Sequence, residues 1–321
     1  MDYSRAVDKL ITRQLRDWDE AGRNYAALAG AVTRQLKLGE STIVLQFNPE
    51  RRRSSAARID KKSLAKRSCF LCTENQPSKQ RALLWEHRYK IQVNPYPIFE
   101  RHLTIADLTH VPQHLSGRIG DMLQLARDLQ DFVVFYNGPL CGASAPDHAH
   151  FQAGCKGAMP LCDEIVHTTT LLLADGDEGF IGYVDILGRS LFTIETTTMR
   201  AAEWYALRLL DKLPLPDGAD EPMVNVLCWW DTTDRAWRLV VFPRRKHRPA
   251  CYGEGEGRLL ISPASVDMGG LWAIPEQEDF ESLTTAQVQA IYDELCMSRN
   301  ELSPVISGYR ENRDGSFDDI F

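Results

Sequence analysis

The stretch Asn137-Gly-Pro-Leu-Cys-Gly-Ala-Ser-Ala-Pro-Asp-His-Ala-His-Phe-Gln152 decides how this chain is interpreted. Its last residues alternate, so on an extended strand His148, His150 and Gln152 would share one face. Three imidazole or amide groups in a row make a poor core surface, which indicates that they face a ligand. The preceding Gly142 and Ser144 are small, and small residues let backbone amides approach an anion such as a phosphate closely.

Working outward, the sequence predicts the same order of elements twice. Hydrophobic periodicity also predicts a helical N-terminus over residues 3–37 and a strand over 42–47. The first set comprises strands 89–93 and 102–106, a helix over 117–132, and strands 132–136 and 148–153. The second set comprises a strand at 191–195, a helix over 199–213, and strands 223–230 and 237–242. This repetition with little sequence identity is typical of an ancient duplication.

Composition and charge restrict the classes of partner. The chain has 321 residues, of which 44% are apolar and 25% charged, as in globular proteins. It contains neither an apolar run of membrane-spanning length nor an apolar N-terminal signal, so we expect a cytoplasmic protein. A net charge of −7 argues against binding nucleic acid or anionic membranes. Basic clusters at 51–53 and 244–248 suit a small polyanion, although two solvated basic turns explain them equally well.

The 137–152 stretch resembles the active-site motif of galactose-1-phosphate uridylyltransferases and of dinucleoside polyphosphate phosphorylases, two branches of the histidine-triad superfamily. It also resembles that of GDP-hexose phosphorylases of the same superfamily. The resemblance implies an α+β fold with two histidine-triad-like halves, each an antiparallel sheet with packed helices. On this basis we expect a helical N-terminal extension (1–40), a half that carries the motif (41–165) and a second half without it (166–321). Family precedent also implies a homodimer.

The same resemblance assigns roles to individual residues. It implies that His150 is a nucleophile that takes a nucleotidyl group and that Gln152 steadies the covalent intermediate. An arginine of 51–53 would reach the phosphates, and we favour Arg51. Arg245, within the 244–248 cluster, is a candidate for a second phosphate or acceptor site, although solvation explains the cluster as well. The residues expected to line the phosphate site are Asn137, Gly142 and Ser144.

Cys69-Phe-Leu-Cys72 is the only close pair among eight cysteines, and in a cytoplasmic protein such a pair indicates a metal or redox site. The zinc-containing uridylyltransferases resemble this pattern. The resemblance implies a zinc ion held by Cys69, Cys72, a loop histidine and His148. We favour His110 over His114 as the loop ligand. Four protein ligands leave no open position, so the zinc would be structural. The alternative is two free cysteines and a space-filling histidine.

The third position of the motif separates types of reaction. Glutamine cannot act as an acid, so Gln152 suits a leaving group that departs as an anion. We therefore expect ping-pong nucleotidyl transfer from a nucleotide sugar or dinucleoside polyphosphate to phosphate or a sugar 1-phosphate. This sequence carries only His247 where uridylyltransferases commonly have a second, histidine-rich metal site, which disfavours the galactose assignment. The alternatives are a nucleotide-binding zinc protein without turnover and a histidine-triad hydrolase.

Overall fold

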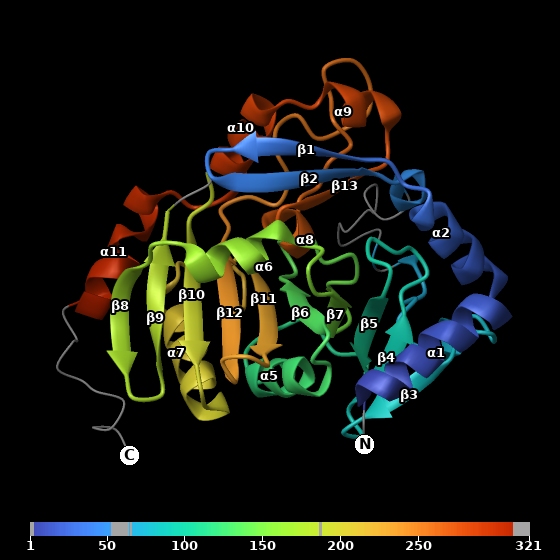
Figure 1. Cartoon of the computed structure of the whole chain (residues 1–321), viewed down its shortest axis with the longest axis horizontal. Helices are drawn as coiled ribbons and strands as arrows, with labels where there is room; N and C mark the ends of the chain where they lie inside the picture. Colours follow the sequence, from blue (N-terminus) through green and yellow to red (C-terminus); the bar gives the residue numbers. More distant parts are fainter. Residues whose placement is uncertain (1–2, 53–63, 65, 186–187, 311–321) are drawn as a thin grey trace.

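The structure is a computed structural model, and it describes residues 3–52, 64, 66–185 and 188–310. A ten-stranded antiparallel sheet forms the centre of the molecule (Figure 1, coloured from blue at the N-terminus to red at the C-terminus). A smaller sheet of three strands lies above one face of it. This arrangement confirms the expected α+β class. None of the described helices is long and apolar enough to cross a membrane.

The large sheet consists of two sets of five strands in the same spatial order. From one edge its order is β3-β4-β5-β7-β6, and from the other edge it is β8-β9-β10-β12-β11. A helix stands between the third and fourth strand of each set. The first set is β3 (Ala82–Trp85), β4 (Tyr89–Val93), β5 (His102–Asp107), α5 (Ile119–Asp128), β6 (Phe132–Asn137) and β7 (His150–Cys155). The second is β8 (Leu171–Gly176), β9 (Gly179–Val184), β10 (Leu191–Thr196), α7 (Met199–Lys212), β11 (Val224–Asp231) and β12 (Ala236–Pro243).

The two sets meet at the centre, where β6 pairs antiparallel with β11 and Asn137 lies opposite Asn225. The predicted order agrees with the structure from β4 to β7 and from β10 to β12, whereas β3, β8 and β9 were not predicted. The domain boundaries at 40/41 and 165/166 stay predictions.

The N-terminal segment differs in part from the expected continuous helix. It forms α1 (Tyr3–Asp17) and α2 (Asp19–Ala29), separated by Trp18 in an extended conformation, and then β1 (Thr33–Leu38). β1 pairs antiparallel with β2 (Ser41–Phe47). Apolar residues such as Leu36 fit helical spacing and also the alternation of a strand. Because the segment pairs with β2, it forms a strand and not a helix.

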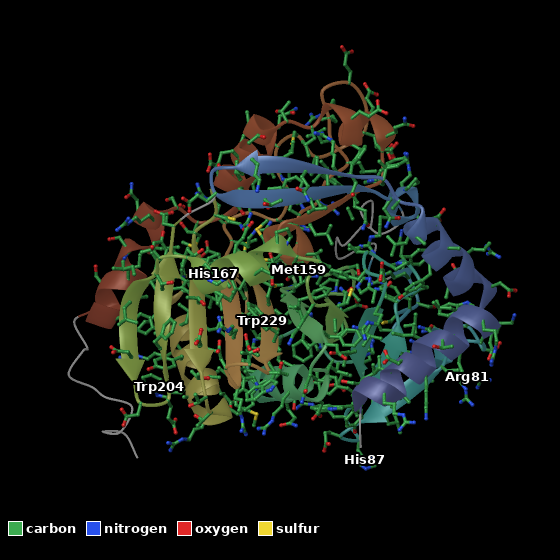
Figure 2. The ribbon with its side chains drawn as sticks, in the orientation of Figure 1. Arg81, His87, Met159, His167, Trp204 and Trp229 are labelled. Carbon is green, nitrogen blue, oxygen red and sulfur yellow. The ribbon has the colours of Figure 1, made fainter. Side chains whose placement is uncertain are left out.

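The two faces of the large sheet carry separate hydrophobic cores. One core lies under α1, α2, α5, α7 and α11 (Arg299–Arg310). The other lies under β1, β2 and the C-terminal elements, where Figure 2 shows Met159 and Trp229 in the interior. Strand β13 pairs parallel with β2, so a strand from the C-terminal part of the chain lies beside one from the N-terminal part. The remaining elements of this layer are α6 (Pro160–Glu164), α8 (Ser265–Met268), β13 (Leu271–Ile274), α9 (Gln277–Ser282) and α10 (Thr285–Leu295).

The packing of the small sheet gives the first testable prediction. Leu45 of β2 is fully buried in the second core, so Leu45→Ala removes contacts and leaves a cavity. We expect a loss of about 2–5 kcal/mol in the free energy of unfolding, measured by urea denaturation. Leu84→Ala is the control, because Leu84 is 59% exposed and its loss should cost less than about 0.5 kcal/mol. Equal effects would contradict this packing.

Candidate functional site

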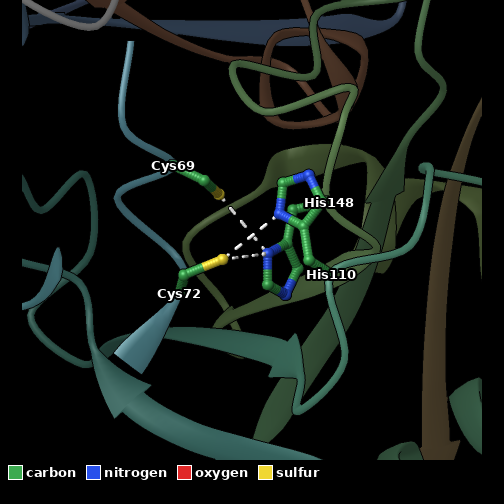
Figure 3. A group of neighbouring side chains, drawn as sticks. All are labelled: Cys69, Cys72, His110 and His148. Carbon is green, nitrogen blue, oxygen red and sulfur yellow. Dashed lines mark hydrogen bonds between the residues drawn. The ribbon is translucent and has the colours of Figure 1, made fainter. Parts of the chain in front are cut away.

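The four residues predicted to bind metal lie together (Figure 3). Their ligand atoms, two thiol sulfurs and two ring nitrogens, are all within 4.8 Å of one another. Nδ1 of His148 lies 3.4 Å from the Cys69 sulfur, and Nδ1 of His110 lies 3.2 Å from the Cys72 sulfur. Two thiols and two imidazoles are a donor set that suits a tetrahedral ion. The cluster therefore fits a metal.

Both histidines of the cluster have polar contacts on the side away from the thiols, and that of His148 is a hydrogen bond. Nε2 of His148 donates to the Asp107 carbonyl at 2.8 Å, which leaves the Nδ1 lone pair directed at the thiols. Nε2 of His110 lies 3.9 Å from the Asp147 carboxylate, and Asp147 forms a salt bridge with Arg67. His114, the alternative to His110, instead lies near the Asp220 carbonyl.

His148 lies outside the strand on which the sequence placed it. Strand β7 begins at His150, and His148 belongs to the turn before it, where its N–H donates to the Ala145 carbonyl. Its ring faces the metal cluster and does not line the cavity described next. The expectation that three side chains share one face is therefore wrong for His148. The cause is the turn, which redirects the ring toward the two thiols.

A cavity of about 560 Å³ opens beside β7, and it collects most of the predicted substrate residues. Its walls come from β4–β7, the loop after β6, the α1–α2 junction, and the segments around α8 and β13. Both candidate catalytic side chains, His150 and Gln152, line it. So do Asn137, Gly142, Ser144 and Arg51.

His150 is buried, with 5% of the residue exposed, and the orientation of its ring is fixed by the backbone. Its Nδ1 lies 2.8 Å from the His148 carbonyl, which can only accept, so Nδ1 carries the proton and Nε2 keeps a lone pair. Burial lowers the pKa of His150 to about 4, which keeps the ring neutral near pH 7. Gln113 anchors the first residue of β7, because its Oε1 accepts a hydrogen bond from the His150 N–H at 2.8 Å.

The amide of Gln152 also has a fixed orientation. His102 accepts the Ile98 N–H at Nδ1, so its Nε2 carries the proton and donates to Oε1 of Gln152 at 3.0 Å. Asn94 donates to the same oxygen at 3.2 Å. With its oxygen occupied, Gln152 can present only its NH₂ group to a ligand in the cavity. No motif in the sequence around His102 indicates this role.

Asn137 is fixed in the same way by the second half of the chain. Its Oδ1 accepts hydrogen bonds from the Ser265 N–H at 2.8 Å and from Nδ2 of Asn225 at 3.0 Å. Its NH₂ group is therefore the part that a ligand in the cavity can contact. Asn137 and Gln152 together offer two amide donors of the kind that bind phosphate oxygens.

The basic residues are placed partly as predicted. Arg51 lines the cavity and donates to the Tyr96 carbonyl at 2.7 Å, whereas Arg52 forms ion pairs with Glu254 and Glu276. Arg53 lies outside the described residues. Burial lowers the pKa of Arg51 to about 10, so the guanidinium stays charged at neutral pH.

The expectation for Arg245 is wrong in placement. Its side chain donates to the Cys296 carbonyl and forms a salt bridge with Glu301, because the chain turns after β12 and directs it toward α11. From the same cluster His247 and Arg248 line the cavity instead. Arg67, which follows the basic stretch after residue 50, also lines it. The charge clusters in the sequence do not indicate which of their members turn inward.

Comparisons with known proteins support the fold. Residues 10–155, less than half of the chain, match DUF4922, a domain of unknown function. The crystal structure of yeast Ap4A phosphorylase Apa2 superposes with a TM-score of 0.54 and 16% identity, covering 87% of this chain and 94% of that chain. Its complex with AMP gives a TM-score of 0.53 and 17% identity, covering 88% and 94%. A search of curated protein sequences finds no significant match.

Dinucleoside polyphosphate phosphorylases, one branch of the histidine-triad superfamily, are among the enzymes whose active-site motif the 137–152 stretch resembles. The predicted resemblance is therefore confirmed at the level of the fold.

The loop before His150 gives a second prediction. Gly142 has φ +97°, and an added Cβ would lie 2.6 Å from the Ala264 Cβ. Gly142→Ala should destabilise the protein by about 1–3 kcal/mol more than Gly117→Ala. Gly117 also has positive φ, but an added Cβ there meets nothing within 4 Å. Thermal unfolding measures both, and Ala264→Gly should partly rescue Gly142→Ala. Equal costs, or no rescue, would show that the loop does not pack against Ala264.

Proposed function

We propose that this chain is a nucleotidyl-transferring enzyme in which Nε2 of His150 attacks the α-phosphorus of a nucleotide. The observation that carries the proposal is a neutral imidazole in the wall of a cavity, with Nδ1–H bound to the His148 carbonyl and Nε2 left as the nucleophilic atom. Histidine is a good nucleophile in this state, and the phosphoramidate that it forms remains reactive.

The proposed reaction consists of two successive displacements at the α-phosphorus. In the first, a bond forms between Nε2 and the α-phosphorus as the bond from phosphorus to the leaving oxygen breaks. The leaving fragment departs as a phosphate-bearing anion, which requires no proton from Gln152. In the second, an oxygen of inorganic phosphate or of a sugar 1-phosphate attacks the same phosphorus, and the bond to Nε2 breaks. The donor would be a nucleotide sugar or a dinucleoside polyphosphate.

The surrounding groups stabilise charge on the phosphate oxygens. The NH₂ groups of Gln152 and Asn137 donate hydrogen bonds, and the Arg51 guanidinium supplies positive charge. Gly142 and Ser144 bring the backbone of their loop to the cavity wall. His102 acts through Gln152, so it is a positioning residue. The fold of an Ap4A phosphorylase supports this reading, although fold alone does not determine function.

A covalent adduct tests the proposal directly. Wild-type protein mixed with NDP-sugars or dinucleoside tetraphosphates, without phosphate, should gain the mass of one nucleotidyl group, that is, a nucleoside monophosphate less one water, by denaturing mass spectrometry. His150→Ala should abolish the adduct and lower turnover by several orders of magnitude, since the nucleophile is lost.

His167→Ala is the matched control, because His167 is an exposed histidine outside the cavity and should keep full activity. Full turnover by His150→Ala would rule out the mechanism. Ligand-induced stabilisation without adduct or product would favour the non-catalytic binding protein, and hydrolysis as fast as phosphorolysis would favour the hydrolase.

We further propose that the ion held by Cys69, Cys72, His110 and His148 is zinc and that it is structural. When bound, it would fix the turn whose His148 carbonyl accepts from His150. Elemental analysis should find about one zinc per chain. Cys72→Ser should lower both the zinc content and the melting temperature, because a ligand is lost. Cys251→Ser, which changes a cysteine outside the cluster, should alter neither. Unchanged zinc in Cys72→Ser would exclude this site.

A further inference from the structure

The N-terminal helical segment reaches the cavity, which nothing in its sequence indicated. Where α1 ends and α2 begins, Trp18 and Glu20 form part of the cavity wall. The extended conformation of Trp18 separates the two helices, and the residue is buried, with 5% of it exposed. The segment therefore contributes to the shape and chemistry of the site from outside the ten-stranded sheet.

This part of the wall is held in place by hydrogen bonds to the β4–β5 connection. Asn24 donates to the Pro95 carbonyl at 2.7 Å, and the Tyr25 hydroxyl donates to the His102 carbonyl at 3.0 Å. The Tyr96 hydroxyl donates to Oε1 of Glu20 at 2.8 Å. Glu20 is thus a positioned carboxylate, unlike a surface glutamate that samples many rotamers.

The charge of Glu20 is opposite to that of most other charged groups in the cavity. Arg51, Arg67 and Arg248 are cationic. Asp267 is the other carboxyl group among the described lining residues, and its Oδ2 accepts the Ala264 N–H. If the Glu20 carboxylate lay beside a phosphate, the two negative charges would repel each other. Tyr96 contacts groups of both charges: its hydroxyl donates to the Glu20 carboxylate, and its backbone carbonyl accepts a hydrogen bond from the Arg51 guanidinium.

An ionised carboxylate offers only hydrogen-bond acceptors, and with two oxygens it matches a pair of adjacent donors. The parts of a nucleotide that present such a pair are the 2′,3′-hydroxyls of ribose and the N1–H and N2–H edge of guanine. Neither carries a phosphate. We propose that Glu20 is a specificity-determining residue that accepts hydrogen bonds from adjacent donors on the nucleoside part of the substrate. This rests on the proposed function only in taking the ligand to be a nucleotide.

The test is calorimetric binding of nucleoside monophosphates to wild-type protein and to Glu20→Gln. The amide keeps the size of the side chain but replaces one acceptor by a donor. Nucleotides that carry the donor pair should bind Glu20→Gln about ten- to a hundredfold more weakly, the usual range for hydrogen bonds to a charged group. Asp19→Asn is the matched control, because Asp19 is an adjacent exposed carboxylate that pairs with Lys79. It should bind as wild type does.

Two comparisons identify the donor pair. If Glu20 binds the ribose, wild-type protein should prefer GMP over 2′-deoxy-GMP, and Glu20→Gln should lose that preference. If Glu20 binds guanine, wild-type protein should prefer GMP over IMP and AMP, and that preference should disappear instead. Tyr96→Phe, which removes the hydroxyl that holds Glu20, should weaken the same preference to a smaller degree.

The outcomes separate this inference from the proposed function. Binding by Glu20→Gln that equals wild type, or that weakens equally for every nucleotide, would overturn the role of Glu20 and leave the role of His150 intact. Failure of wild-type protein to bind any nucleotide would overturn both. A preference that Glu20→Gln abolishes would support Glu20 even where the covalent adduct is never observed.

Discussion

The hydrogen bond from Nδ1 of His150 to the His148 carbonyl is the interaction on which the site depends. It links two neighbouring histidines with different tasks. The ring of His148 faces the thiols of Cys69 and Cys72, while its backbone carbonyl determines which nitrogen of His150 carries the proton. The position of the candidate metal ligands and the protonation state of the cavity histidine are therefore coupled through one residue, because moving the turn would move both.

A second constraint is the orientation of two side-chain amides. Gln152 and Asn137 come from the recognisable motif, but the groups that fix them do not. His102 and Asn94 hold the oxygen of Gln152, and Ser265 and Asn225 hold that of Asn137. An amide that could rotate would offer an acceptor to an anion as often as a donor. Fixing both oxygens leaves the two NH₂ groups as the parts that can face the cavity before any ligand arrives, which is the arrangement that an anionic ligand requires.

The parts of the site that sequence could predict are those encoded by local spacing. Hydrophobic periodicity and turn residues predicted most of the central strands and the loop before His150, and Cys69-x-x-Cys72 predicted the cluster. Contributions that depend on the path of a distant segment could not be predicted. The inward turn of Arg248 and the outward turn of Arg245 follow from how the chain leaves β12. The break at Trp18 depends on packing, since its flanks are equally compatible with one helix.

The second half of the chain keeps a role although it lacks the motif. Pairing of β11 with β6 covers what would otherwise be an open sheet edge beside the site. It also supplies a buried chain of hydrogen bonds, in which Arg244 donates to Oδ1 of Asn225 and Asn225 donates to Oδ1 of Asn137. Each bond polarises the next, so the guanidinium makes the NH₂ group of Asn137 a better donor. On β12, Val240 and Phe242 pack into the core where the first half has its cavity. One half thus holds the candidate reactive groups, and the other orients them.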